Sequence, residues 1–258
     1  MKDIKIIVAA HKTYRMPEDT MYLPVHVGAE GKENIGYQPD NAGENISTKN
    51  AFFSELTGLY WAWKNLDAEY IGLAHYRRHF KGDRKGPDIF DRILTKAEAD
   101  KLLNKTDIIV TKKRRYFIEN IYDHYAHTLY VETLDKAKEI IEAKYPEYIP
   151  AYNKCMKRTH MHAFNMFIMK KELLDEYCAW IFDILFDLEE ALKDKKYNAF
   201  HSRYPGRVSE VLLDVWLETN GYTYKEVPFL YTEKVNMVKK VIMFLRAKFF
   251  KEKYEASV

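Results

Sequence analysis

A strand-like segment that ends in aromatic and basic residues is the part of this chain best suited to chemistry. Glu69–Phe80 begins with an apolar run and continues as His75-Tyr76-Arg77-Arg78. Ligands of open α/β sheets bind at the carboxyl ends of the strands. Because a guanidinium group matches phosphate oxygens bidentately, the two arginines predict a site for a phosphate-bearing ligand. The alternative is a solvated charge pair after a buried strand.

A second polar cluster follows the first predicted strand. His11, Lys12 and Tyr14 come directly after the apolar, β-branched run Ile4–Ala10. A lysine and a tyrosine at such a place suit a nucleobase or a phosphate. The alternative is an ordinary polar turn.

The segment between Ala29 and Asn50 is a long loop, rich in Gly, Asn, Asp and Pro. Asp40, Asn45 and Ser47 lie in it, and their carboxylate, amide and hydroxyl groups can bind the hydroxyls of a ligand. The same residue types are common in turns, and Ser47 or Thr48 could instead cap a helix that begins near Asn50.

Two tryptophans lie on that helix, close after Glu55. Trp61 and Trp63 are two residues apart, so they cannot both face the core from a one-sided helix. One of them is therefore predicted to face a ligand, with packing as the alternative for either.

His160 and His162 are two apart in a segment expected to be extended, so they point to the same side, as metal ligands can. No carboxylate flanks them, and we expect no metal site there. Asn165 lies in the strand predicted at Ala163–Met169.

A last polar cluster surrounds a Pro-Gly pair near residue 205. Arg207 follows a predicted turn, and Glu210 lies in the first turn of a helix predicted at Val208–Asn220, with Ser209 as its cap. The helix dipole stabilises a carboxylate there. Glu210 is thus either a capping residue or a catalytic base.

Composition places the chain among globular proteins. It has 258 residues, 47% of them hydrophobic, and a net charge of +3 that is too small to indicate nucleic-acid binding. Cys155 and Cys178 have no metal-type spacing, so free thiols in a reducing cytosol are expected. The first residues lack a signal-like apolar stretch, and no apolar run approaches about 18 residues. We expect a protein that is neither secreted by such a signal nor membrane-spanning.

Hydrophobic patterns predict strands that alternate with helices, and hence an α/β sheet. The predicted strands are Ile4–Ala10, Leu23–Gly28, Tyr70–Ala74, Asp107–Thr111, Ala163–Met169 and Lys225–Leu230. Beyond the tryptophan helix, the predicted helices are Thr95–Lys105, Asn120–Lys144 as one helix or two, Lys171–Leu192 and Val208–Asn220.

The last segment, Lys239–Tyr254, reads as a basic amphipathic helix. Ile242, Phe244 and Phe249 alternate with Arg246 and Lys248. Such a helix suits the surface of an anionic bilayer. Packing against the protein's own domain is the alternative.

Taken in order, these motifs resemble a bacterial family of capsular and exopolysaccharide glycosyltransferases long labelled a domain of unknown function. The matching segments are Ala10–Lys12, Leu23–Ala29, Asp40–Ser47, Glu55–Asn65, Gly72–Arg78, Asn165 and Arg207–Glu210. The resemblance implies a GT-A-like fold, a single α/β domain (1–235) with a mixed, mostly parallel sheet flanked by helices. The basic helix (236–258) would follow as a membrane-surface anchor.

The resemblance also implies an activity: transfer of a hexose, such as galactopyranose or galactofuranose, from a nucleoside diphosphate sugar to a lipid-linked oligosaccharide. A UDP-sugar is the expected donor, and the cytoplasmic face of the cell membrane the expected location. Most GT-A enzymes hold Mn²⁺ or Mg²⁺ with an Asp-x-Asp motif, which this sequence lacks. Arg77 and Arg78 would offset the charge of the leaving diphosphate instead. The alternative is a non-catalytic carbohydrate- or nucleotide-binding accessory protein.

The expected roles divide into three groups. The catalytic residues are Glu210, Arg77 and Arg78. The donor-binding residues are His11, Lys12, Tyr14, Asn45, Ser47, His75 and Tyr76. The residues for the acceptor or the sugar are Asp40, Trp61, Trp63, His162, Asn165 and Arg207.

Overall fold

The computed structural model describes residues 2–233, 237–250 and 253–254. The chain forms two compact units, each assembled from separate stretches of sequence. The first unit comprises Met1–Lys112, Phe164–Ala179 and Thr223–Glu233, and the rest forms the second. These units do not coincide with the expected division at residue 235, which stays a prediction.

The first unit contains a nine-stranded sheet, counted over the described residues. Its main path runs β10-β6-β9-β4-β1-β2-β3, while β5 pairs with β4 and with β11. The bounds are β1 Ile4–Ala10, β2 Tyr22–His26, β3 Gln38–Pro39, β4 Tyr70–His75, β5 Arg78–Phe80, β6 Ile108–Thr111, β9 Phe167–Lys170, β10 Lys225–Val227 and β11 Phe229–Tyr231. Only β9 runs against its neighbours on this path, so the other six strands share one direction. The expected α/β class with a mixed, mostly parallel sheet is confirmed.

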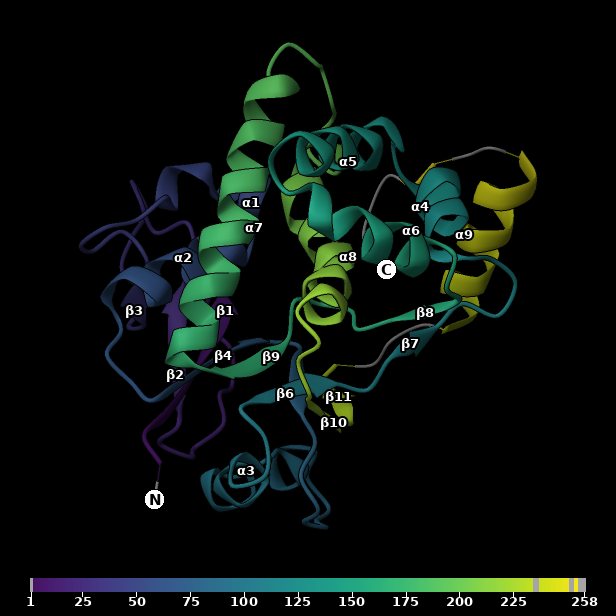
Figure 1. Ribbon diagram of the computed structural model, residues 1–258. Coiled ribbons are helices and arrows are strands. Elements are labelled where there is room, and N and C mark those ends of the chain that lie inside the picture. Colours follow the sequence, from purple (N-terminus) through teal and green to yellow (C-terminus); the bar gives the residue numbers. More distant parts are fainter. Residues whose placement is uncertain (1, 234–236, 251–252, 255–258) are drawn as a thin grey trace. The chain divides into compact units, whose positions relative to one another are not determined.

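Helices flank this sheet (Figure 1). They are α1 (Asn50–Phe53), α2 (Leu56–Asn65) and α3 (Lys96–Leu103). Helix α2 contacts β1 and β4, and α3 contacts β6. Strand β1 is buried along almost its whole length, which explains its continuous apolar sequence. Thr95 and Glu98 form a capping box at the start of α3, as expected of a helix in this segment.

Strands β4 and β9 approach each other closely at Gly72. A Cβ atom added there would lie 2.7 Å from the carbonyl oxygen of Phe167. Glycine therefore allows β9 to pair beside β4. This pairing places Phe167, the first residue of β9, opposite Leu73, and so determines where the preceding segment ends.

The tryptophan helix is interrupted, contrary to the single helix expected from near Asn50. Helix α1 ends at Phe53, and Ser54 takes a left-handed conformation with φ of 53° before α2 begins. The predicted cap at Ser47 or Thr48 is also wrong, because the N-cap residue of α1 is Lys49 and this helix has no side-chain cap.

The second unit is mainly helical. Its helices are α4 Ile121–Thr128, α5 Glu132–Lys144, α6 Ile149–Met156, α8 Tyr204–Thr219 and α9 Met237–Phe250. Helix α7 (Lys171–Ala191) begins in the first unit, and its part from Trp180 belongs to the second. Helix α8 packs on α5 and α6. Strands β7 (Arg114–Arg115) and β8 (His160–Met161) pair in this unit.

Two sequence expectations are settled in this unit. The segment Asn120–Lys144 forms a pair of helices, and the basic segment near residue 240 is helical. Residues 251–252, and the side chains of residues 237–241, 245 and 250, lie outside the described part of the chain. Within the described part, no helix combines the length and apolarity that a bilayer span requires.

Candidate functional site

One edge of the sheet gathers most of the predicted donor-binding residues. Strands β1, β2 and β4 are parallel, so their carboxyl ends lie at the same edge, with Ala9 paired to His75 and Ala10 to His26. Strand β9 is antiparallel to β4, and its first residue, Phe167, pairs with Leu73. The segment before β9 therefore meets the segments after β1 and β4.

Aromatic rings meet where β1 and β4 end. The rings of Tyr14 and Tyr76 stack with centroids 3.8 Å apart and planes 20° apart. His11 meets Tyr76 edge-on at 5.2 Å. Burial raises the pKa of the Tyr76 hydroxyl, which keeps it protonated. The Tyr37 hydroxyl, which the sequence did not single out, donates to the Tyr14 carbonyl (2.7 Å) and accepts from its amide (2.9 Å).

This cluster is amphipathic in the way a nucleobase site is, because stacked rings are combined with cations and hydroxyls. The ammonium of Lys12 lies 5.2 Å from the centroid of Tyr14, and the guanidinium of Arg77 lies 5.0 Å from that of Tyr76. The edge thus brings His11, Lys12, Tyr14 and Tyr76 together, as expected.

The two arginines have different surroundings. Arg77 is exposed, and its Nε lies 2.7 Å from a Glu233 carboxylate oxygen. Arg78 is half-buried, with its guanidinium 4.3 Å from the ring of Phe164 and 5.7 Å from that of Tyr231. Consecutive residues at a strand start point in different directions, which accounts for the difference. Their action as one paired group stays a prediction.

Arg78 carries a donor for which the described part of the chain supplies no acceptor. Among the described residues, its buried Nε has no hydrogen-bond partner. A buried N–H group normally has an acceptor, so one left without any calls for an explanation. Oxygen atoms of a phosphate would satisfy this geometry, because the guanidinium fork matches them.

His75 and Asn165 fix the segment before β9. The His75 ring lies 2.5 Å from the Phe164 carbonyl oxygen through Nε2, which therefore acts as the donor. Phe164 and Asn165 both adopt left-handed backbone, with φ of 75° and 53°. The amide of Asn165 donates to Glu55 Oε1 at 2.8 Å. Asn165 lies two residues before β9 begins, so its expected place within a strand was wrong.

Glu55 was not among the predicted site residues, although the structure places it at the site beside Asn165. It lies directly before α2, where the helix dipole stabilises a carboxylate. The signal for Glu55 in the sequence was its position close to Trp61 and Trp63. Its partner Asn165 lies 110 residues away and could not be recognised from the sequence.

Asp40, Asn45 and Ser47 shape the loop beside this edge. Asp40 is fully buried and accepts hydrogen bonds from the Gly28 amide (2.8 Å), the Ala29 amide (3.0 Å), the Ser47 hydroxyl (2.5 Å) and the Thr57 hydroxyl (2.6 Å). Asn45 donates to the carbonyls of Asn41 and Gly43 and accepts from the Ser47 amide. The contacts of Asp40 make it a positioning residue for the loop.

The two tryptophans divide as the helix pattern predicts. Trp61 is buried, and its indole Nε1 has no hydrogen-bond partner among the described residues. Trp63 is half-buried, with the Lys64 ammonium 3.8 Å from its ring centroid. Only Trp63 is placed where a ligand could reach it, and its role in sugar binding stays a prediction.

The remaining predicted residues belong to the second unit. His162 is fully buried, and its Nδ1 contacts Asp214, whose other oxygen accepts from the His162 amide at 3.1 Å. The guanidinium of Arg207 lies 3.8 Å from the ring of Phe200. His162 therefore holds β8 to α8, and sugar binding by it stays a prediction.

The helix that carries Glu210 begins earlier than predicted. Helix α8 starts at Tyr204, with Pro205 in its first turn, so the Pro-Gly pair is not a turn. Ser209 is buried inside the helix and donates to the Gly206 carbonyl instead of capping. Glu210 consequently lies in the second turn, half-buried, and the predicted first-turn position was wrong.

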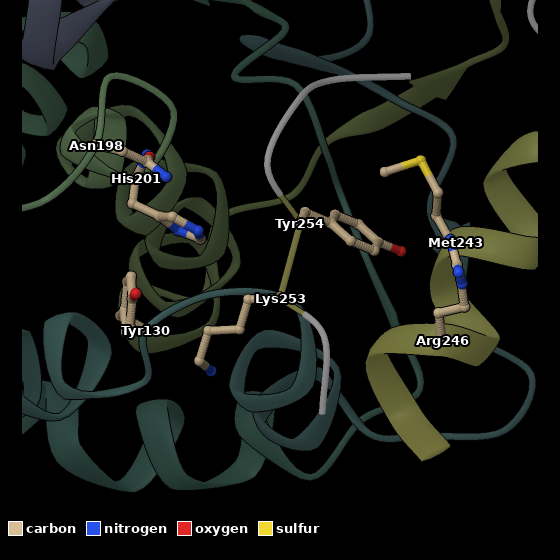
Figure 2. Close-up of a pocket in the computed structure, with 7 residues that line it drawn as sticks. All are labelled: Tyr130, Asn198, His201, Met243, Arg246, Lys253 and Tyr254. Carbon is tan, nitrogen blue, oxygen red and sulfur yellow. The ribbon is translucent and has the colours of Figure 1, made fainter. Parts of the chain in front are cut away.

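A pocket of about 400 Å³ lies within the second unit (Figure 2). It is lined by Tyr130, Asn198, His201, Met243, Arg246, Lys253 and Tyr254. The Lys253 ammonium donates to the carbonyls of Ala126 and Leu129 at the end of α4. Lys253 therefore stabilises the pocket wall, and two of the hydrogen-bond donors of its ammonium group are already used.

The residues at the sheet edge suit anions better than a divalent metal. Among the described residues, no group of three or more His, Cys, Asp or Glu side chains could hold a metal ion. The carboxylates of Glu55 and Glu233 are engaged by Asn165 and Arg77, and that of Asp40, in the loop beside this edge, accepts four hydrogen bonds within the loop and from Thr57. This donor set does not fit the Mn²⁺ or Mg²⁺ usual for the fold.

Comparison with known proteins supports the α/β fold and identifies the family of this chain. The family described as a domain of unknown function, DUF4422, matches residues 5–221. The chain belongs to this family. The DUF4422 match spans β1 to the end of α8, and so includes the sheet edge and Glu210. None of the curated proteins matches the chain.

Among solved structures, this DUF4422 chain is similar to the apo structure of WbbM, a bifunctional glycosyltransferase. The two share 30% sequence identity, and the TM-score is 0.83 over 90% of this chain. The match covers 46% of the WbbM chain, so this chain corresponds to about half of that protein.

Proposed function

We propose that this chain is a glycosyltransferase domain that moves a hexose from a nucleoside diphosphate sugar to a lipid-linked oligosaccharide. The observation that carries the proposal is the buried Arg78 Nε, which has no hydrogen-bond partner among the described residues, at the sheet edge where β1 and β4 end. The likeness to WbbM supports the reaction class, and the absence of an Asp-x-Asp sequence motif supports an arginine in its place.

The donor nucleotide binds in this proposal to the aromatic and basic residues after β1 and β4. Its base lies against the rings of Tyr14 and Tyr76, near His11 and Lys12. Its diphosphate accepts hydrogen bonds from Arg78, which stabilises the negative charge that develops as the diphosphate leaves. Arg77 adds positive charge from the exposed side.

The sugar of the donor lies near Glu55 and Asn165. A carboxylate beside an amide offers an acceptor and a donor for ring hydroxyls. The left-handed backbone at Phe164 and Asn165 aims the amide at Glu55, and the loop held by Asp40 adjoins α1 and α2. Galactose in pyranose or furanose form is our proposed hexose.

Glu210 acts as the base in this proposal. It accepts the proton of the acceptor hydroxyl, whose oxygen then forms a bond to the anomeric carbon of the sugar. The bond between that carbon and the diphosphate oxygen breaks, and the electron pair leaves with the nucleoside diphosphate.

The proposal is tested by a panel of UDP- and dTDP-sugars, with and without manganese. We expect at least one of them to raise the melting temperature without manganese and to release free nucleoside diphosphate. Binding without release would instead indicate a non-catalytic accessory protein. Binding that requires manganese would contradict the role given to Arg78.

A further inference from the structure

Large apolar side chains are exposed mainly on two segments of the second unit. Phe117 and Ile118, in the loop between β7 and α4, are 92% and 63% exposed. Ile242 and Phe249 on α9 are 52% and 68% exposed. Elsewhere in the described residues only Phe52, at 40%, is comparable. Apolar side chains concentrated in this way mark an interaction surface.

The loop and α9 lie side by side. The ammonium of Lys248 on α9 lies 3.1 Å from Glu119 Oε1, at the end of the loop. The His124 ring on α4 packs between Tyr116 of the loop, at 4.2 Å, and Phe244 of α9, at 5.4 Å. Figure 1 likewise shows the chain after β7 passing next to α9. The four exposed apolar residues are therefore carried by adjoining elements.

Positive charge accompanies these side chains. Residues 112–118 contain four basic residues and no acidic one, and the same is true of α9. Arg114, Arg115 and Arg246 are exposed. The carboxylate of Glu119 is buried and already paired with Lys248 and His127, while Asp123 is exposed at the start of α4. Exposed Phe and Ile among cations are complementary to an anionic lipid surface.

We propose that residues 113–118 and α9 together form one docking surface for an anionic phospholipid bilayer. The loop supplies a second apolar anchor beside the helix, and Phe117 and Ile118 insert among the lipids while Arg114 and Arg115 face the headgroups. The free energies of apolar insertion and of electrostatic attraction to the lipids add together. The loop and α9 together should therefore bind the bilayer more tightly than α9 alone. This surface stands on its own geometry and not on the proposed reaction.

Sedimentation of the full chain with vesicles tests the proposal. The vesicles contain equal parts of phosphatidylcholine and phosphatidylglycerol, or phosphatidylcholine alone. We expect binding to the anionic vesicles that weakens with added salt, and little binding to the neutral ones. Joint replacement Phe117→Ser and Ile118→Ser should weaken binding at least about tenfold, because two large side chains no longer leave water. Both residues are exposed, so folding should be unaffected.

Two controls complete the experiment. Phe52→Ser, in the first unit, should leave vesicle binding unchanged, and Ile242→Ser with Phe249→Ser should weaken it as the loop variant does. Equal binding by the wild type and the loop variant, or equal binding to both vesicle types, would overturn the proposal. So would light scattering that shows a dimer of the free protein dissociating in the loop variant, because the surface would then join copies of the chain.

Discussion

The side-chain amide of Asn165 donates a hydrogen bond to Glu55 across 2.8 Å, and left-handed backbone stands next to both residues. Ser54 precedes Glu55 with φ of 53°, and Phe164 and Asn165 have φ of 75° and 53°. Within the described residues, these three are the non-glycine residues with positive φ. Such strain persists where the surrounding structure imposes it, often at functional sites.

This contact predicts different outcomes for two substitutions of Asn165. Glycine removes the amide but adopts the left-handed conformation freely, whereas alanine removes the amide and adds strain of about 1 kcal/mol. Both variants should lose nucleoside diphosphate release to a similar extent. Urea denaturation should show the lower free energy of unfolding for Asn165→Ala. Full activity in Asn165→Gly would remove the amide from the proposed site.

Replacing Glu210 with glutamine separates chemistry from binding. The amide has a similar shape and cannot accept the proton, so transfer should fall by about 100-fold or more, within the range for loss of a general base. The thermal shift that the sugar nucleotide induces should stay as in the wild type. Retained turnover would exclude Glu210 as the base.

The buried Asp40 carboxylate predicts a loss of stability. Asp40→Asn replaces one acceptor oxygen by an NH₂ group that faces existing donors, so the free energy of unfolding should drop by about 2–4 kcal/mol. Asn41→Ala is the matched control, since the hydrogen bond that its side chain donates to Glu30 is exposed. This substitution should change stability by less than about 0.5 kcal/mol. Equal effects in both variants would contradict the role of Asp40 in holding the loop.

Acid should destabilise the chain through His79. Burial, together with nearby His75, lowers the pKa of His79 to about 4 from an ordinary 6.5. Between pH 6.5 and about pH 4, His79 is therefore protonated in the unfolded chain but neutral in the folded chain. The free energy of unfolding decreases as the pH falls through this range. The loss attributable to His79 is about 2 kcal/mol between pH 7 and pH 5. In urea unfolding, His79→Gln should show a shallower dependence on pH, and an unchanged slope would be inconsistent with a neutral, buried His79.

Local patterns in the sequence sufficed for strands β1, β2, β4 and β6 and for the polar residues that follow β1 and β4, whereas β3 and β5 were not predicted. The apolar run Ile4–Ala10 is β1, and the polar residues predicted after β1 and β4 meet as expected. The position of β1 follows from the local pattern of apolar residues. The meeting of the polar residues follows because the carboxyl ends of parallel strands lie at the same edge of the sheet. The alternation of strands and helices likewise predicted the α/β class.

Long-range partners could not be predicted from the sequence. Asp214 lies 52 residues from His162, and Glu233 lies far along the chain from Arg77. Each pairing changes the environment of a predicted site residue, and no local pattern encodes it. The prediction of a turn at the Pro-Gly pair near residue 205 was wrong for another reason. Proline suits the first turn of a helix as well as it suits a β-turn, and here it lies in the first turn of α8.

The central claim is that Arg78 binds the diphosphate of an activated sugar, and donor binding to Arg78→Lys tests it most directly. Lysine keeps the charge but loses the planar fork, so titration calorimetry should show a dissociation constant at least about tenfold higher than in the wild type. Arg77→Lys, at the exposed arginine, should change it less. Unchanged affinity in Arg78→Lys, for a sugar nucleotide that the wild type binds, would contradict the account.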